Sequence, residues 1–342
     1  MKVLILAGGF ATRLWPLTEC RAKPLLLLDG KTILAHILEK VPETAEIFLL
    51  TNQAFEKDFL KELNFLGRKN FKIFCEDAYS DGDKLGALKA ISVAIKEFDI
   101  QENVLVFAGD NVLPELDIST LEVDESEACI AVREVKSLDE ARKFGVVSIR
   151  DGGLIRPIRQ AQGLQQAQGR QGTSDKEEVI TFEEKPENPK SKLVSTAFLS
   201  IGKNLFEILH KFSTSSPDAL GAIFSEFLRQ KKRVSAIEVE GPWFDIGSFE
   251  TYLEAHKELQ ESNLKRQENV IEGSNKFSGK VFLGKGVVVK NCKISDSIIY
   301  PGVKLENCHI SQSVIDEGCQ LRGLDLNRKL IRKGTVLMEN EE

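Results

Sequence analysis

The sequence has no long apolar run. Its apolar stretches, such as residues 3–7 and 24–28, hold only five residues, whereas a membrane-spanning helix needs about 20. The first stretch is also too short for the apolar core of a secretory signal. We therefore expect a cytoplasmic protein with no membrane partner.

The sequence also has no C-x-x-C pair. Six scattered cysteines in a chain of 342 residues disfavour both a zinc site and a disulfide framework. We expect reduced and mostly buried thiols at Cys20, Cys75, Cys129, Cys292, Cys308 and Cys319.

Positive charge is not in excess. The 46 Lys and Arg residues face 52 Asp and Glu residues, which gives a net charge of −6. A protein that neutralises many phosphates of a nucleic acid carries a clustered basic surplus, so we expect no nucleic-acid partner. The 42% hydrophobic content provides enough apolar material for a folded core, and the length suggests two domains.

Residues 1–262 alternate short apolar strands with helical patterns, which is typical of βαβ units on a mostly parallel, Rossmann-like α/β sheet. A polar interruption at residues 159–172, RQAQGLQQAQGRQG, predicts a flexible surface insertion. The predicted strands are 3–6, 47–51, 71–74, 104–107, 128–132, 179–182 and 195–201. The predicted helices are 33–41, 55–66 and one that begins at residues 216–218.

The last sixty residues follow a repeat of 16 residues. Glycines recur at 286, 302, 318 and 334, and aliphatic residues recur between them every five or six positions. This rhythm predicts a left-handed parallel β-helix of the hexapeptide-repeat kind over residues 281–342, after a linker at 263–280. Cys292 and Cys308 occupy the same place in successive repeats, so we expect them to stack inside the coil.

A glycine-rich segment follows the first predicted strand. Residues 6–18 read LAGGFATRLWPLT, and Lys23 follows in RAKPLL. Glycines free backbone N–H groups to point at phosphate oxygens, while Arg13 and Lys23 add the positive charge that a triphosphate requires. The segment matches neither the P-loop nor the dinucleotide fingerprint.

A carboxylate ends the strand at residues 104–107, in the sequence VLVFAGDN. Asp110 is therefore expected at the carboxyl edge of the sheet, where open α/β sheets bind ligands.

With these motifs the whole chain resembles the sugar-phosphate nucleotidyltransferases, the family that includes glucose-1-phosphate thymidylyltransferases and mannose-1-phosphate guanylyltransferases. The family opening L-A-G-G-x-G-T-R-L-x-P-L-T and its later K-P are matched, except that Ala11 replaces a glycine. The resemblance implies that the nucleotide binds at Leu6, Ala7, Gly8, Gly9, Arg13, Lys23 and Gly86.

The resemblance also implies roles for residues farther along the chain. Asp110 and Asp245, the latter in WFDIG, correspond to the two carboxylates that hold Mg²⁺. Glu184 and Lys185, in FEEKP, correspond to the residues that contact the sugar and its phosphate, and Gly145 and Thr196 are further candidates for the sugar. Arg13, Lys23 and Lys185 are the predicted catalytic residues.

The implied reaction joins an NTP to a sugar-1-phosphate, with release of pyrophosphate. Two alternatives stay open: a catalytically inactive relative that acts as a binding or regulatory subunit, and an acyltransferase built on the C-terminal coils. We expect the coils to cap or join subunits of a homo-oligomer, because a short stack leaves apolar ends. The four histidines receive no catalytic role.

Overall fold

The computed structural model describes residues 1–78, 82–151, 154–155, 176–218, 220–259, 264–265 and 269–338. The chain divides into two compact units. Unit 1 comprises residues 1–9 and 35–243, and unit 2 comprises residues 10–34 and 244–342. The predicted insertion at 159–172 lies outside the described residues.

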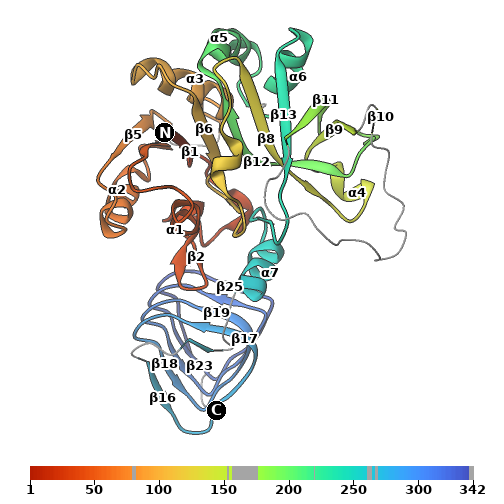
Figure 1. Ribbon diagram of the computed structural model, residues 1–342. Helices are drawn as coiled ribbons and strands as arrows, with labels where there is room; N and C mark the ends of the chain where they lie inside the picture. Colours follow the sequence, from red (N-terminus) through yellow and green to blue (C-terminus); the bar gives the residue numbers. More distant parts are fainter. Residues whose placement is uncertain are drawn as a thin grey trace. The chain divides into compact units, whose positions relative to one another are not determined.

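Unit 1 is built on a ten-stranded sheet in the order β10-β9-β11-β13-β8-β12-β6-β1-β4-β5 (Figure 1). The strands are β1 (Lys2–Leu6), β4 (Glu46–Asn52), β5 (Phe71–Glu76), β6 (Val104–Ala108), β8 (Glu127–Glu134), β9 (Gly145–Asp151), β10 (Leu154–Ile155), β11 (Glu177–Glu184), β12 (Leu193–Ile201) and β13 (Arg233–Glu238); β7 (Asn111–Val112) is a further short strand. All seven strands predicted in this part of the sequence are confirmed.

The sheet is parallel in one half and mixed in the other. β1 pairs in parallel with β4 and β6, and β4 pairs in parallel with β5. β12, in contrast, runs antiparallel to both β6 and β8, and β9 runs antiparallel to β11. The expected parallel order therefore holds where helices connect the strands, because a parallel neighbour requires a long crossover.

Helices α3, α5 and α6 share one hydrophobic core with the sheet (Figure 1). The helices of unit 1 are α2 (Glu56–Phe65), α3 (Ala87–Glu97), α4 (Leu138–Ala141), α5 (Phe206–Ser215) and α6 (Ala222–Arg229), with η3 (Ile118–Leu121) and η4 (Lys203–Leu205) as short 3-10 turns; α1 (Ile33–Leu38) spans the boundary between the units. Among the described residues, no helix has the length and apolar content to cross a membrane.

The helix expected to begin at residues 216–218 begins later, at Ala222. Ser216 instead ends α5. The carbonyl oxygen of Pro217 accepts the N–H groups of Leu88 and Lys89 at 2.8 and 3.2 Å, so this turn satisfies donors at the start of α3. The turn is used to cap another helix and cannot begin a helix of its own.

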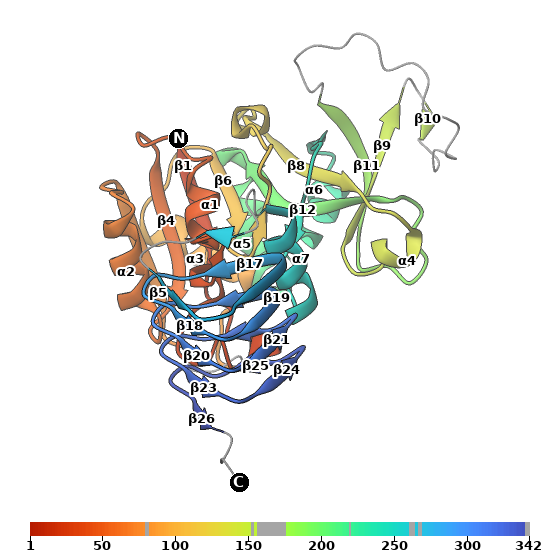
Figure 2. The ribbon, with the colours of Figure 1, turned by 90° about the horizontal axis from the view of Figure 1, so that it is seen from below.

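Unit 2 contains a parallel β-helix, whose stacked coils are visible in Figure 2. Ile294, Ile310 and Leu326 lie in register, and so do Val289, Leu305 and Leu321. Each of these pairs is 16 residues apart, so the predicted repeat is confirmed. The strands are β15 (Leu264–Lys265), β16 (Val270–Glu272), β17 (Lys276–Leu283), β18 (Val288–Lys290), β19 (Lys293–Ile299), β20 (Lys304–Glu306), β21 (His309–Ser311), β22 (Val314–Ile315), β23 (Gln320–Arg322), β24 (Asp325–Asn327), β25 (Leu330–Ile331) and β26 (Val336–Met338).

The interior of the β-helix is aliphatic and includes cysteines. Cys292, Cys308 and Cys319 are buried within it, and the backbone N–H of Cys308 contacts the Cys292 sulfur at 3.4 Å. The expected stacking of Cys292 on Cys308 is therefore confirmed. Assembly through the coils stays a prediction.

The expected linker is wrong in part. Part of the predicted linker at 263–280 forms strands of the β-helix, because β16 pairs with β18 and β17 pairs with β19. The two compact units do not follow the limits of the predicted catalytic domain of residues 1–262, because residues 10–34 and 244–259 belong to unit 2. The remaining elements of unit 2 are η1 (Thr12–Leu14), η2 (Lys23–Leu25), β2 (Leu27–Leu28), β3 (Lys31–Thr32), β14 (Phe244–Asp245) and α7 (Phe249–Leu259).

We predict that Ile310→Asp strongly destabilises the β-helix. Ile310 has no exposed surface and stacks between Ile294 and Leu326, so a carboxylate there would be buried without a partner. The expected loss is about 4 kcal/mol or more. His309→Ala, on the exposed face of the same strand, should stay within about 0.5 kcal/mol. Thermal unfolding of both variants tests this register, and equal melting temperatures would contradict it.

Candidate functional site

A cavity of about 150 Å³ lies at the carboxyl ends of β1, β4 and β5 in unit 1. The first turn of α3 forms another part of its wall. The lining residues are Leu6, Gly8, Gly9, Leu50, Thr51, Phe74, Glu76, Lys84, Gly86, Ala87, Ala90 and Asp218. The cavity thus brings together four of the predicted nucleotide-binding residues, Leu6, Gly8, Gly9 and Gly86, from two distant parts of the sequence.

Two of these glycines lie close against their surroundings. A Cβ atom at Gly8 would lie 2.7 Å from the Glu76 carboxylate. Gly86 has φ +87, and a Cβ atom there would lie 2.7 Å from both Asp218 and the Pro217 carbonyl. A side chain at Gly86 would be strained and would collide with the turn that caps α3, whereas a side chain at Gly8 would displace the Glu76 carboxylate from the cavity wall.

Glu76 is the functional candidate that the sequence analysis missed. Glu76 is only 8% exposed, and its Oε2 accepts the backbone N–H of Leu85 at 2.9 Å. Burial raises the pKa of this carboxyl group, although the Leu85 N–H and the Lys84 ammonium oppose the rise. Glu76 is the last residue of β5. The rule that selected Asp110, a carboxylate at the carboxyl end of a parallel strand, would also have selected Glu76.

Asp110 follows the end of β6 and is held by its neighbour. The side-chain Nδ2 of Asn111 donates to the Asp110 Oδ1 at 2.9 Å. The side-chain Oδ1 of Asn111 accepts the Trp243 indole N–H at 2.7 Å. The Trp243 ring in turn packs on Phe144, with 4.9 Å between centroids. Asp110 is therefore connected through buried or half-buried contacts to residues 144–147, the FGVV segment.

The FGVV segment adjoins the predicted sugar residues. Gly145 of β9 pairs with Glu184 of β11, and the backbone N–H of Lys185 donates to the Phe144 carbonyl at 3.1 Å. Lys185 has φ 46, and its ammonium lies 4.0 Å from the Glu184 carboxylate. Partial burial raises the pKa of Glu184, and the charge of Lys185 opposes that rise. Unit 1 thus brings Asp110, Gly145, Glu184 and Lys185 into one connected region.

Two of the predicted sugar contacts lie against other parts of unit 1. Thr196 is fully buried, and its hydroxyl donates to the Ala131 carbonyl at 2.9 Å, so the hydroxyl faces the core. The register of β12 shifts between Ser195 and Leu199, which breaks the usual alternation of its side chains. At Gly145, a Cβ atom would lie 2.3 Å from the Phe182 ring. The Phe182 ring thus leaves no room for a side chain at Gly145, and the predicted contact of Gly145 with the sugar stays a prediction.

The remaining predicted residues divide between the two units. Ala7 is buried in unit 1, and its N–H donates to the Leu50 carbonyl at 2.7 Å. Arg13, Lys23 and Asp245 all belong to unit 2. Arg13 is exposed, whereas Lys23 and Asp245 are half-buried. Ala11, which replaces the family glycine, adopts the left-handed conformation with φ 48 and ψ 46.

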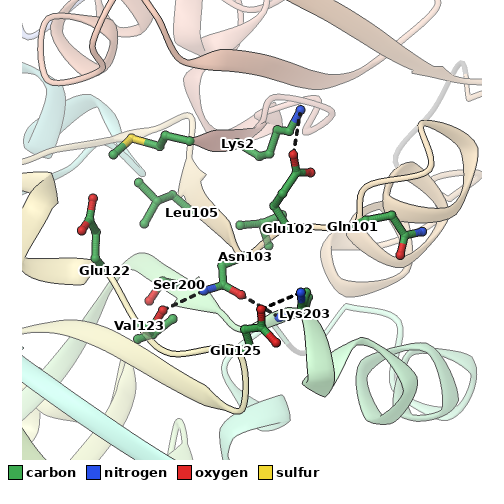
Figure 3. Close-up of a pocket in the computed structure, with 12 residues that line it drawn as sticks. Lys2, Gln101, Glu102, Asn103, Leu105, Glu122, Val123, Glu125, Ser200 and Lys203 are labelled. Atoms are coloured by element: carbon green, nitrogen blue, oxygen red, sulfur yellow. Dashed lines mark hydrogen bonds and ion pairs between the residues drawn. The ribbon is translucent and has the colours of Figure 1, made fainter.

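A second cavity, of about 380 Å³, lies at the opposite edge of the same sheet (Figure 3). Its walls include Lys2 and Val104 at the amino ends of β1 and β6. Its cations are engaged in ion pairs: Lys2 lies 3.5 Å from Glu102, and Lys203 lies 2.6 Å from Glu125. Open α/β sheets bind ligands at the carboxyl ends of their strands, so the smaller cavity is the candidate site.

Comparison with known proteins agrees with this geometry. Residues 2–262 match the family model described as nucleotidyl transferase. A Methanocaldococcus jannaschii protein named bifunctional protein GlmU is 30% identical over 84% of this chain. This chain spans only 61% of that relative. A Haloferax volcanii protein named UTP–glucose-1-phosphate uridylyltransferase AglF is 26% identical over 78% of this chain and all of its own.

Solved structures show the same fold. One from Bacillus anthracis, named as a glucose-1-phosphate thymidylyltransferase, superposes with a TM-score of 0.59 at 21% identity, and covers 78% of this chain and 98% of its own. A UDP-glucose pyrophosphorylase structure gives 0.55 at 23% identity, with 75% and 96% covered. The glycine loop, the carboxyl-edge cavity and the family match over residues 2–262 agree, and the chain belongs to the nucleotidyl transferase family.

Proposed function

We propose that the protein transfers a nucleoside monophosphate from an NTP to a sugar-1-phosphate. A phosphate oxygen of the sugar-1-phosphate attacks the α-phosphorus of the NTP in line, the bond to the pyrophosphate breaks, and an NDP-sugar forms. No covalent intermediate with the protein is involved. The single observation that carries this proposal is the cavity formed by Gly8, Gly9, Glu76 and Gly86 at the carboxyl edge of the sheet.

The cavity has the size and position of a nucleobase site. Its volume of about 150 Å³ is below the roughly 300–1,000 Å³ that accommodates a whole ligand, so it fits part of a nucleotide. The glycine loop at its rim leaves open space beside Gly9, where no described atom lies within 4 Å of a Cβ position. Backbone N–H groups of such a loop suit phosphate oxygens.

The residues of this chain would act by positioning and by neutralising charge. Arg13 and Lys23 would bind the phosphates of the NTP. Lys185 would bind the phosphate of the sugar-1-phosphate, and Glu184 would accept hydroxyl groups of the sugar. The left-handed conformation of Lys185 and its N–H bond to the Phe144 carbonyl support a fixed placement of that segment.

Asp110 and Asp245 would hold Mg²⁺, which neutralises phosphate charge when it is bound. Both carboxylates are half-buried, and carboxylate oxygens are the ligands that Mg²⁺ prefers. No group of three or more His, Cys, Asp or Glu side chains in the described part of the chain is arranged to hold a metal ion. Two carboxylates would be enough for Mg²⁺, because this ion usually keeps water and substrate phosphate in its coordination sphere.

The Glu76 carboxylate favours guanine as the base. An ionised carboxylate only accepts hydrogen bonds. The Watson–Crick edge of guanine offers adjacent N1–H and N2–H donors, whereas uracil and thymine offer one N–H between two carbonyl groups that a carboxylate would repel. Because Glu76 is buried at the cavity wall and only its Oε2 accepts the Leu85 N–H, an unmatched base would leave the remaining acceptor sites of the carboxylate unpaired.

The direct test is pyrophosphate release in the presence of Mg²⁺, with each NTP combined with a panel of sugar-1-phosphates. Activity with at least one pair supports the proposal. NTP binding without any turnover would instead favour a catalytically inactive relative.

We predict that Asp110→Asn and Asp245→Asn each reduce kcat by about 100-fold or more, because each removes a charge that would hold the metal. Both replacements keep the side-chain size, so the melting temperature should change little. The check is pyrophosphate release over a range of Mg²⁺ concentrations. A rate like that of the unmodified protein at ordinary Mg²⁺ in either variant would remove that residue from the metal site.

We predict that Glu76→Gln weakens the preference for GTP over UTP by about tenfold or more, because an amide offers both an acceptor and a donor. The ratio of kcat/KM for the two nucleotides measures this effect. Glu102→Gln, in the wall of the larger cavity, is the matched control and should leave the ratio unchanged. An unaltered ratio in Glu76→Gln would show that Glu76 does not contact the base.

The same variant tests the raised pKa of Glu76. A carboxyl group whose pKa is raised by folding favours the folded state when protonated, and that contribution is lost as the pH rises through the raised pKa. Gln does not titrate. The melting temperature of Glu76→Gln relative to the unmodified protein should therefore rise between pH 4 and pH 8, and a constant difference would contradict the pKa shift.

A further inference from the structure

Residues 10–34 carry the two cations assigned to the NTP phosphates, Arg13 and Lys23, yet they belong to the unit that contains the β-helix. We name these residues the signature segment. The first contact between the signature segment and the coils is Arg21. Its guanidinium lies 3.2 Å from Asp316 and 2.8 Å from Glu317, and stacks on the Tyr300 ring at 4.9 Å from its centroid.

Arg21 and Asp316 are shielded from water. The side chain of Arg21 is 13% exposed, and that of Asp316 is 4% exposed. Ion pairs that are removed from water are screened far less than surface pairs. Removal of one partner leaves the other charge buried and unpaired, which makes such a contact costly to break.

The second contact consists of hydrogen bonds between the backbone of Leu27 and two tyrosine hydroxyl groups. Its N–H donates to the Tyr300 hydroxyl at 3.0 Å, and its carbonyl accepts the Tyr252 hydroxyl. The two hydroxyl groups are 2.9 Å apart, so a hydrogen bond from Tyr300 to Tyr252 closes the ring. Both tyrosines are fully buried. Tyr300 belongs to the β-helix and Tyr252 to α7, so two elements hold the two peptide units on either side of the Leu27 Cα atom.

A third contact pairs Glu19 with Arg332, whose guanidinium reaches both carboxylate oxygens, at 2.6 and 2.8 Å. The three contacts therefore fall at residues 19, 21 and 27, on both sides of Lys23 and shortly after Arg13. Each group on the coils comes from the part of the chain after residue 299. A segment held at three places has few alternative conformations to lose when a substrate binds.

We propose that the β-helix acts within its own chain as a positioning device for the NTP, with Arg21, Tyr300 and Asp316 as positioning residues. They hold the signature segment in one conformation, in which Arg13 and Lys23 can bind the phosphates of the NTP. This inference rests on the proposed function, because it takes the NTP as the ligand of those cations. It assigns to the coils a role in catalysis that does not depend on subunit assembly.

Steady-state kinetics of Arg21→Ala test the proposal. The KM for the NTP should rise, or kcat should fall, by about 10- to 100-fold. The KM for the sugar-1-phosphate should stay within about twofold, because Glu184 and Lys185 lie on unit 1. Arg21→Lys, which keeps the charge but not the fork of donors, should recover part of the loss. Arg328→Ala, an exposed arginine of the coils that pairs with Glu250 at 3.0 Å, is the matched control and should behave like the unmodified protein.

Hydrogen–deuterium exchange supplies a readout that needs no substrate. In Arg21→Ala the amides of residues 10–26 should exchange faster, while those of the coils at 293–331 should keep their protection. Tyr300→Phe preserves the ring and its packing, and should give a smaller increase of exchange at residues 10–26. This variant therefore tests the proposal if Arg21→Ala does not fold.

The outcomes are distinct. Unchanged exchange and an unchanged KM for the NTP would overturn the proposal, and so would an equal loss for both substrates that follows the melting temperature. If the unmodified protein releases no pyrophosphate with any substrate pair, the proposed function fails. Binding of GTP and UTP, measured by calorimetry on Arg21→Ala and the unmodified protein, then still decides whether the anchored segment positions a nucleotide.

Discussion

The parallel alignment of β1 with β4 and β6 is the constraint on which the candidate site depends. Leu6 lies opposite both Leu50 and Ala108 in this register, so the loops after three strands begin at one edge of the sheet. The glycine pair after β1 and Asp110 after β6 therefore start from the same edge, and β5 brings Glu76 to it. Parallel strands concentrate polar loop residues in this way because all their carboxyl ends face one direction.

The groups assigned to the reaction are divided between two structural units. Unit 1 holds the cavity, Asp110, Glu184 and Lys185, whereas unit 2 holds Arg13, Lys23 and Asp245. The chain passes from one unit to the other within the glycine loop itself, after Gly9. The left-handed Ala11 lies directly beyond this point. The continuous sequence motif thus belongs to two structural units, and its second part is anchored to the coils within unit 2.

The β-helix shows how a stack of coils can carry a specific contact. Its interior is a uniform set of aliphatic residues and cysteines that repeats every 16 residues, and this uniformity fixes the register of every rung. Tyr300 and Asp316 occupy equivalent places one coil apart, and each contacts the signature segment. The regular interior therefore fixes the positions of side chains that do not repeat, such as Tyr300 and Asp316, and a flexible linker could not fix them in this way.

The sequence alone determined the periodic features of this protein: the alternation of strands and helices, the 16-residue coil register, and the glycine loop with Asp110 at the carboxyl edge. These features are local, because hydrophobic period and turn chemistry depend on neighbouring residues. The tertiary structure decided the rest. The approach of Glu76 to Gly8, the use of Pro217 to cap α3, the inward turn of Thr196 at a bulge and the attachment of residues 10–34 to the coils all join residues that are far apart in the chain. Such contacts follow from strand order and packing, which no local pattern contains.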